Sequence, residues 1–150
     1  MAVRALEAFR HILVPVSETR SCDQAMAIAC RLAADRGATV SVLTAIEVPP
    51  ELPLQAQMPA EEADARRVVA EARAIAELYG VTVEVRVVRA RAAGEAIVEA
   101  VTSGGAELVV LGAPRKQRAS RRAPVFGRTV AFVLAQSPCR VMVAAPPPRS

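Results

Sequence analysis

The chain has 150 residues, of which 53% are hydrophobic, 23% are charged and only 3% are aromatic. A chain of this length buries about 70% of its unfolded surface and needs neither disulfides nor a metal to hold a core, so we expect one domain over residues 1–150. The longest apolar runs, residues 25–30 and 130–135, fall far short of the roughly 20 residues of a membrane span, which argues against insertion into a membrane.

Charge is unevenly distributed along the chain, although the formal net charge is only +4. No acidic residue follows Glu107, and residues 108–150 carry eight basic groups, whereas residues 1–107 carry 11 basic and 15 acidic groups. This asymmetry predicts that the C-terminal third of the chain meets an anion.

Cysteine, histidine and the N-terminal residues limit the chemistry further. Residues 1–9 show no apolar stretch of a secretory signal, so we expect a cytoplasmic protein. The single histidine, His11, excludes zinc sites built on paired histidines. The three cysteines have no metal or redox spacing and are predicted to be small buried apolar residues: Cys22, Cys30 and Cys139.

The first half of the chain alternates strand-like and helix-like patterns. Residues 12–16 form a predicted strand, and the helix that follows ends near Gly37. The apolar stripe of this helix is predicted at Ala25, Ile28, Ala29 and Leu32. Residues 39–46 predict a second strand, and four prolines between positions 49 and 59 predict a stiff exposed loop before a helix over residues 61–79.

The pattern continues with a strand over residues 81–88, where valine alternates with charged residues, so that either one face of the strand meets solvent or the strand lies at an edge of the sheet. A helix is predicted over residues 93–103, and a strand buried on both faces over residues 107–111. Residues 112–124 have five basic groups and no hydrophobic period, which is typical of a functional loop. A last helix over residues 127–137 and a strand over residues 140–145 complete the chain.

In that last helix, Val130, Val133 and Leu134 are expected to face inward, and helix packing is expected to bury Phe132. The alternation of strands and helices predicts an α/β fold, with an open parallel sheet and helices on both faces. Ligands of such sheets bind outside the carboxyl ends of the strands, so the candidate loops are residues 15–20, 45–50 and 112–127.

Five segments in this order resemble the universal stress protein (UspA) family: His-Ile-Leu-Val-Pro-Val at 11–16, Glu-Ala-Ile-Val-Glu-Ala at 95–100, Ala-Glu-Leu-Val-Val-Leu-Gly at 106–112, Gly-Arg-Thr-Val at 127–130 and Ser-Pro-Cys-Arg-Val-Met-Val at 137–143. The resemblance covers about residues 9–145. It implies a Rossmann-like five-stranded sheet ordered 3-2-1-4-5 and a homodimer. In one branch of the family it also implies ATP or AMP, with Mg²⁺ accompanying ATP, between the loops after strands 1 and 4.

The nucleotide branch resembles the pattern G-x-x-G, nine residues, then G followed by Ser or Thr. Gly112 matches the first glycine and Gly127 the third, but Arg115 replaces the second glycine, Arg128 takes the Ser/Thr place before Thr129, and the spacing is two residues longer. Ser17 replaces the acidic residue that the family sets after the first strand. We therefore expect a degenerate nucleotide site made of Pro15, Val16, Ser17, Ala45, Leu111, Gly112, Pro114, Arg115, Gly127, Arg128 and Thr129.

Two interpretations of the basic loop stay open. Arginines could replace glycine amides as charged donors to phosphate, or they could be a solvated surface on a decayed site. The first predicts an adenine-nucleotide-binding regulatory protein that acts in stress response or on an unidentified protein partner. The second predicts a dimeric interaction module without nucleotide, of the kind that occurs beside membrane transporters.

The remaining expectations concern catalysis and assembly. The sequence shows no catalytic constellation, so we expect no enzyme, with slow ATP hydrolysis left open. Nucleic-acid binding is disfavoured because Phe126 and Phe132 are the only aromatic residues near the basic loop. The homodimer is expected through the fifth strand, where Val141, Met142 and Val143 form an apolar edge.

Overall fold

A computed structural model describes residues 9–17, 20–113 and 127–145 of the chain. These residues form a five-stranded sheet in the order β3-β2-β1-β4-β5, in which all neighbouring strands are parallel. The predicted α/β fold and strand order are confirmed, and the predicted strands and helices end within two residues of the observed bounds. The elements are β1 (His11–Pro15), α2 (Arg20–Arg36), β2 (Thr39–Glu47), α3 (Pro59–Leu78), β3 (Val83–Ala90), α4 (Ala93–Gly104), β4 (Leu108–Gly112), α5 (Arg128–Gln136) and β5 (Arg140–Ala144).

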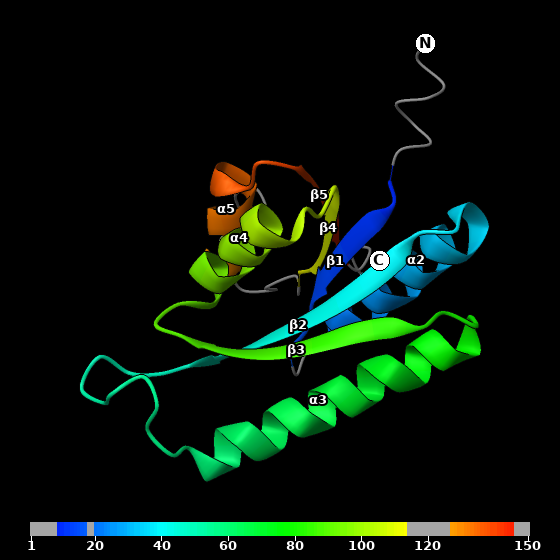
Figure 1. Ribbon diagram of the computed structural model, residues 1–150. Helices are drawn as coiled ribbons and strands as arrows, with labels where there is room; N and C mark the ends of the chain where they lie inside the picture. The colour runs from blue at the N-terminus through cyan, green and yellow to red at the C-terminus, as the bar shows by residue number, and fades with distance from the viewer. Residues whose placement is uncertain (1–8, 18–19, 114–126, 146–150) are drawn as a thin grey trace, which may run out of the picture.

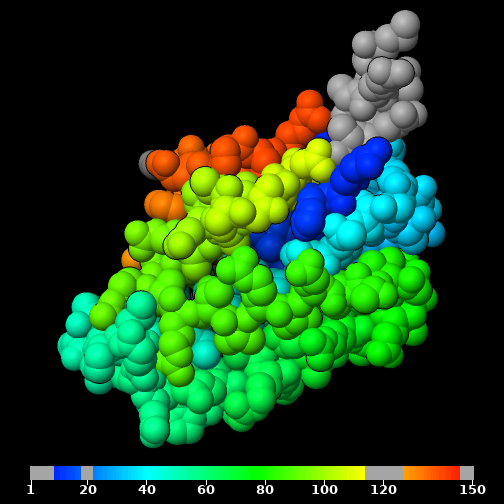
Figure 2. All heavy atoms as spheres, in the orientation of Figure 1, coloured from blue at the N-terminus to red at the C-terminus, as the bar shows by residue number. Residues whose placement is uncertain are grey.

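Helices cover both faces of the sheet: α2 and α3 lie on one face, and α4 and α5 lie on the other (Figure 1). The strand β1 has the pattern that this arrangement requires, because side chains alternate between the two faces. Ile12, Val14 and Val16 enter the core under α2, while Leu13 enters the core under α4 and α5. In the space-filling view, α3 and β3 (green) run along one side of the molecule, opposite the orange-to-red α5 and β5 (Figure 2).

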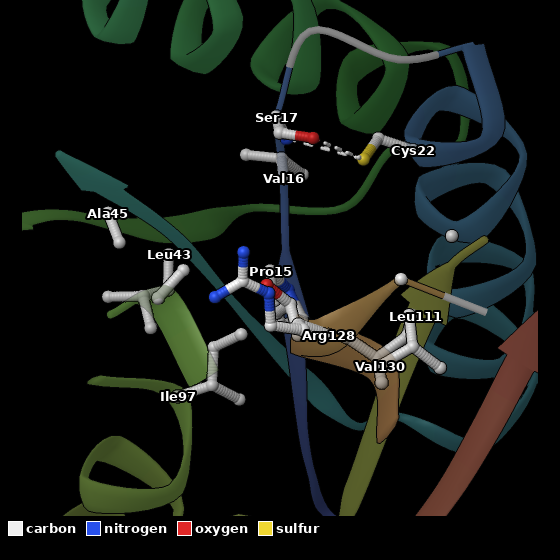
Figure 3. Close-up of a pocket in the computed structure, with 14 residues that line it drawn as sticks. Pro15, Val16, Ser17, Cys22, Leu43, Ala45, Ile97, Leu111, Arg128 and Val130 are labelled. Atoms are coloured by element: carbon white, nitrogen blue, oxygen red, sulfur yellow. Dashed lines mark hydrogen bonds between the residues drawn. The ribbon is translucent and has the colours of Figure 1, made fainter. Parts of the chain in front are cut away.

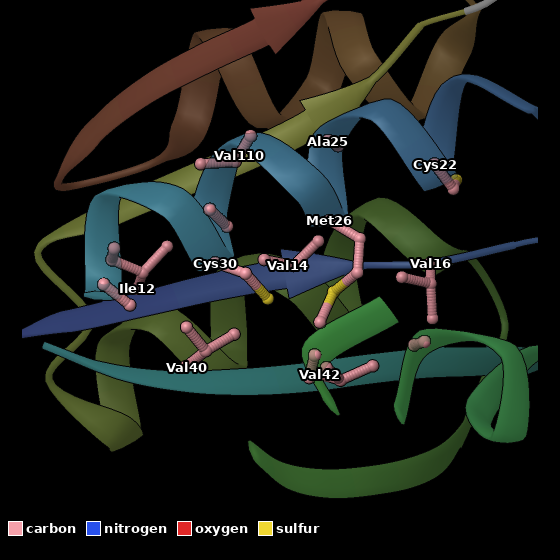
Figure 4. Close-up of a cluster of buried hydrophobic side chains, with 14 of the residues drawn as sticks. Ile12, Val14, Val16, Cys22, Ala25, Met26, Cys30, Val40, Val42 and Val110 are labelled. Carbon is pink, nitrogen blue, oxygen red and sulfur yellow. The ribbon is translucent and has the colours of Figure 1, made fainter. Parts of the chain in front are cut away.

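The helix α2 packs on the sheet through a stripe that differs from the predicted one. Ile28 is 37% exposed, so its expected inward position was wrong. The buried stripe runs through Cys22, Ala25, Met26, Ala29, Cys30 and Ala33. This i, i+3, i+4 spacing places mostly small side chains against the sheet, and Met26 fills the space between α2 and the strands (Figure 4). Burial raises the pKa of the Cys30 thiol, as expected for a cysteine that serves as an apolar core residue.

The helix α5 also departs from the prediction. Val130 and Val133 are buried as expected, but Leu134 is 47% exposed and Phe132 is 38% exposed, so both were wrongly assigned to the interior. A nine-residue helix turns only an i, i+3 pair toward the sheet, and the residues beside that pair fall on its flanks. The Phe132 ring lies against Gly94 of α4, so closely that a Cβ atom added to Gly94 would lie only 2.8 Å from the Cδ1 atom of Phe132. The thiol residue Cys139 is half-buried, whereas Cys22 and Cys30 are buried as predicted.

The edge position, one of the two alternatives predicted for residues 81–88, is confirmed by β3, which pairs only with β2 in the described part of the chain. Two arginines at its end hold the proline-rich loop that follows β2. Arg89 donates to the carbonyl oxygen of Ala56 at 2.7 Å and to a carboxylate oxygen of Glu62 at 2.6 Å. Arg91 donates to the carbonyl oxygens of Pro49 and Leu52, at 2.6 Å and 2.8 Å. The loop is therefore fixed to the sheet edge by hydrogen bonds that its own sequence could not reveal.

The Glu62 carboxylate makes the free energy of unfolding depend on pH. A hydrogen bond from the Met58 N–H and another from Arg89 lower the pKa of Glu62. A carboxyl with a lowered folded-state pKa stabilises the fold above its unfolded pKa, and this contribution is lost as the pH falls through the folded pKa. We expect Glu62→Gln to lower the free energy of unfolding at neutral pH, and its difference from wild type to shrink below about pH 4.5.

Urea unfolding of both proteins from about pH 7 to about pH 3 measures this difference. Glu77→Gln, which removes an exposed carboxylate from the same helix, is the matched control and should change stability little. If Glu62→Gln lowers the free energy of unfolding by the same amount over the whole pH range, the stabilisation does not come from the ionised Glu62 carboxylate.

Candidate functional site

The strand order reverses at β1, which lies between β2 and β4, and a pocket opens at the carboxyl ends of these three strands. We call it the apolar pocket; its volume is about 230 Å³. The starts of α4 and α5 close its other side. Its lining residues are Pro15, Val16, Ser17, Cys22, Leu43, Ala45, Ala93, Ile97, Leu111, Gly112, Gly127, Arg128, Thr129 and Val130.

The end of β1 is held in place by contacts from two sides of the pocket. The Val16 N–H donates to the Leu43 carbonyl at 2.8 Å, which extends the pairing with β2 past Pro15. The Ser17 N–H lies 3.2 Å from the Sγ atom of Cys22, in the first turn of α2 (Figure 3). The Ser17 hydroxyl also lies 3.5 Å from this Sγ atom, so the buried thiol positions both the backbone and the side chain of Ser17 at the pocket wall.

The N-termini of α4 and α5 both reach the pocket, but only one is already occupied by a carboxylate. The Ala93 N–H, at the start of α4, donates to the Oε2 atom of Glu47 at 2.8 Å. At α5, Gly127 is the N-cap residue and supplies no side-chain hydrogen bond. The first amides of a helix have no acceptor within the helix, so α5 presents to the pocket a positive dipole end and N–H groups that no described side chain caps.

The Arg128 side chain adds a full positive charge to this helix end. It is exposed and extends from α5 toward the end of β1, over the region of Pro15 (Figure 3). Its neighbours in the wall, Ile97, Leu111 and Val130, are apolar. The pocket therefore combines an apolar cavity with a cationic helix N-terminus, a combination suited to a ligand with a flat apolar ring and an anionic group.

Nine of the eleven residues predicted for the site line this one pocket. Pro114 and Arg115 lie outside the described residues. The structure adds five residues that the sequence did not single out: Cys22, Leu43, Ala93, Ile97 and Val130. Leu43 could have been found because successive strand residues face opposite sides of the sheet, so Leu43 lies on the other face from Val42. Ala93 and Ile97 follow an edge strand, so only the topology brings them to the site.

Two larger hollows adjoin the apolar pocket. One, of about 700 Å³, shares Ala93, Arg128 and Thr129 with it and extends along α5 to Phe132; we call it the outer hollow. The other, of about 440 Å³, shares Ser17, Ala45, Ala93 and Thr129 and extends toward α3; we call it the acidic pocket. A ligand in the apolar pocket thus has room to continue in two directions.

No carboxylate lines the apolar pocket within the described part of the chain, and no group of three metal-ligating side chains occurs among those residues. Nor does any described helix have the length and apolar character needed to cross a membrane.

Comparison with known proteins gives the family. A family model described as the universal stress protein family matches residues 8–145, nearly the whole chain. No curated protein matches the sequence significantly.

Solved structures agree with the family match. A universal stress protein in complex with cAMP is 23% identical, with 92% of this chain and 98% of that chain covered and a TM-score of 0.69. The Archaeoglobus fulgidus protein in complex with dAMP is 17% identical over 90% and 97% of the two chains, with a TM-score of 0.70. An Arabidopsis thaliana family protein with AMP bound is 14% identical over 91% and 92%, with a TM-score of 0.65. At these identities the likeness establishes the fold.

Proposed function

Because the chain belongs to the universal stress protein family, we propose that it is a regulatory protein that binds an adenine nucleotide, ATP or AMP, in the apolar pocket. The observation that carries the proposal is the N-terminus of α5, which has no side-chain cap among the described residues and opens with Arg128 onto an apolar cavity at the switch point of the sheet. The cAMP, dAMP and AMP complexes of similar structures support the choice of an adenine nucleotide.

The apolar wall suits the base. Ile97, Leu111 and Val130 can cover a purine ring, and its removal from water contributes favourably in proportion to the apolar area buried. At about 230 Å³ the apolar pocket is smaller than most small-molecule sites, which measure about 300–1,000 Å³. The ribose then lies by Ser17 at the wall of the apolar pocket, and the phosphate extends past Arg128 and Thr129 into the outer hollow, which shares these two residues.

The phosphate is bound by the amides of the first turn of α5 and by the Arg128 guanidinium, which can grip a phosphate through two N–H groups. Pro114 and Arg115 belong to the proposed site on sequence grounds alone. The Ala113 N–H is already paired with the Ala144 carbonyl at 2.9 Å, so this amide is not free for a ligand. Arginine side chains thus take over part of the task that backbone amides perform at a glycine-rich loop.

The wall of the apolar pocket offers no ligand for magnesium. Mg²⁺ is bound by oxygen ligands such as carboxylates, and no described residue of the apolar pocket carries one. The outer hollow, toward which the phosphates extend, is lined by Glu47 and Glu95. Any Mg²⁺ that accompanies ATP would therefore be held by the phosphates, with these two carboxylates as the oxygen ligands that the described wall of the outer hollow supplies.

Nucleotide binding is proposed to regulate a protein partner through the surface at the start of α5. A ligand that contacts only one arrangement of a surface shifts the protein toward that arrangement. Self-association through β5 is part of the same proposal, since Met142 is 38% exposed on the edge strand. The protein is proposed to act in the cytoplasm, in stress response or the control of its partner.

The decisive experiment compares the affinities of ATP, AMP and adenosine for wild type and Arg128→Ala by calorimetry. Hydrogen bonds to charged groups contribute about 1.5–3 kcal/mol, so Arg128→Ala should weaken ATP and AMP roughly 10- to 100-fold and leave adenosine nearly unchanged. Arg73→Ala removes an exposed arginine from α3, outside the pocket, and serves as the control. Equal losses in both variants, or no binding of any adenine compound, would refute the site and favour a dimeric interaction module without nucleotide.

Ser17 offers a gain-of-function test at the ribose. Its hydroxyl gives a neutral hydrogen bond where an aspartate would give a charged one, and the charged bond contributes more by about 1 kcal/mol. We expect Ser17→Asp to tighten AMP and adenosine several-fold. Ser17→Ala should do the opposite by a smaller factor. Unchanged or weaker binding by Ser17→Asp would show that the ribose does not lie against Ser17.

Light scattering tests the dimer. An unpaired edge strand with an exposed apolar side chain favours pairing with a second copy, so we expect a dimer at tens of micromolar protein. Met142→Lys adds a charge to this edge and should shift the protein to monomer, while Val87→Lys on the opposite edge strand should not. A monomeric wild type, or dissociation by Val87→Lys alone, would contradict pairing through β5.

A further inference from the structure

The acidic pocket has features that the nucleotide proposal does not use. Its volume of about 440 Å³ is within the range of small-molecule sites. It lies between the carboxyl end of β2 and the first turns of α3. Every charged residue that lines it is acidic, although the protein as a whole carries a formal net charge of +4. The lining residues are Ser17, Thr44, Ala45, Ile46, Glu47, Glu61, Asp64, Ala65, Val68, Ala93 and Thr129.

Thr44 is the feature that points to a ligand. It is 5% exposed and is the one buried polar or charged residue among those the structure describes. On β2 it stands between Val42 and Ile46 on the face toward α2 and α3, where apolar side chains otherwise pack. Its hydroxyl makes no hydrogen bond within the described part of the chain. No described side-chain oxygen is both sealed from solvent and unpaired, so this hydroxyl opens into the pocket that Thr44 lines.

The carboxylates of the pocket are only partly compensated. Glu47 uses its Oε2 atom to accept the Ala93 N–H, which leaves Oε1 available. Asp64 pairs with Arg67 at 3.1 Å, and both side chains are about half-exposed. Glu61 forms no ion pair with a described residue. The pocket therefore has an unpaired hydroxyl at its floor and excess negative charge on two different elements at its rim.

We propose that the acidic pocket binds a small alkyl diamine, with one ammonium group on Thr44 and the other among the rim carboxylates. An ammonium group has three N–H donors and no acceptor. It matches this pocket, whose polar side chains are carboxylates, which only accept hydrogen bonds, and hydroxyls, which can accept them. A bound metal ion is a poorer match, because no described residues form a group of three metal-ligating side chains. This proposal goes beyond nucleotide binding and does not depend on it, since the diamine binds without a phosphate.

The two pockets share walls, which links the proposals physically. Ser17, Ala45, Ala93 and Thr129 line both the acidic pocket and the apolar pocket. A cation in one and an anionic nucleotide in the other attract each other across a short distance. By reciprocity, the diamine should tighten AMP by the same factor by which AMP tightens the diamine.

The test uses putrescine, with 1,4-butanediol as the neutral analogue of the same length, titrated into the full chain by calorimetry at about 0.15 M salt. Without nucleotide, putrescine should bind at a single site with a dissociation constant on the order of 1 mM, and the diol should not bind. Thr44→Val, which keeps the shape of the side chain, should weaken putrescine several-fold. Glu61→Gln should weaken it by a similar factor, while Glu77→Gln, outside the pocket on the same helix, should have no effect.

Two results would overturn the proposal. Equal losses in Glu61→Gln and Glu77→Gln would mean diffuse attraction to surface carboxylates, and unchanged affinity in Thr44→Val would mean that the floor of the pocket is not used. Thermal melts confirm that each variant is folded, and Thr44→Ser keeps the hydroxyl and should restore affinity. Because these titrations contain no nucleotide, they fail or succeed independently of the adenine site.

Discussion

The burial of β1 on both faces is the constraint on which the rest of the structure depends. Ile12 and Val14 are fully buried on one side and Leu13 is 4% exposed on the other, so helices must cover both faces of the sheet. Parallel strands joined by right-handed helical crossovers satisfy this requirement, and they place β1 between β2 and β4. The reversal of strand order at β1 then leaves a crevice at the carboxyl ends of the strands, where every feature of the candidate site is found.

Within that crevice, a single hydrogen bond makes the two helix N-termini different. Glu47 accepts the first amide of α4, so this helix end is neutralised by the protein itself. The start of α5 has no such partner among the described residues and also carries Arg128. The crevice is consequently polarised, with a cationic side at α5 and an acidic side between β2 and α3. A nucleotide would bind at the cationic side and a small organic cation at the acidic side.

The loop between β2 and α3 is fixed by contacts with β3. Arg89 and Arg91 supply charged donors to backbone carbonyls of the loop, those of Ala56, Pro49 and Leu52. A small apolar cluster of Ile46, Val48, Met58 and Ala65 lies beneath it. These contacts hold Glu47 and the first turn of α3 in place, and with them the acidic wall of the crevice. The edge strand therefore shapes the site without contributing a side chain to the apolar pocket.

The sequence by itself determined the alternation of strands and helices, the buried central strands and nine of the fourteen residues that line the apolar pocket, because hydrophobic period and loop position are local properties of a chain. It placed Ile28, Phe132 and Leu134 in the interior wrongly, since apolarity alone does not say which apolar residues of a helix face the sheet and which lie on its flanks. The capping of α4 by Glu47 and the arginine contacts join residues at least 27 positions apart, and the open hydroxyl of Thr44 depends on several packed elements. Only the tertiary structure decides such features, because they depend on which distant groups the packing brings within hydrogen-bond distance.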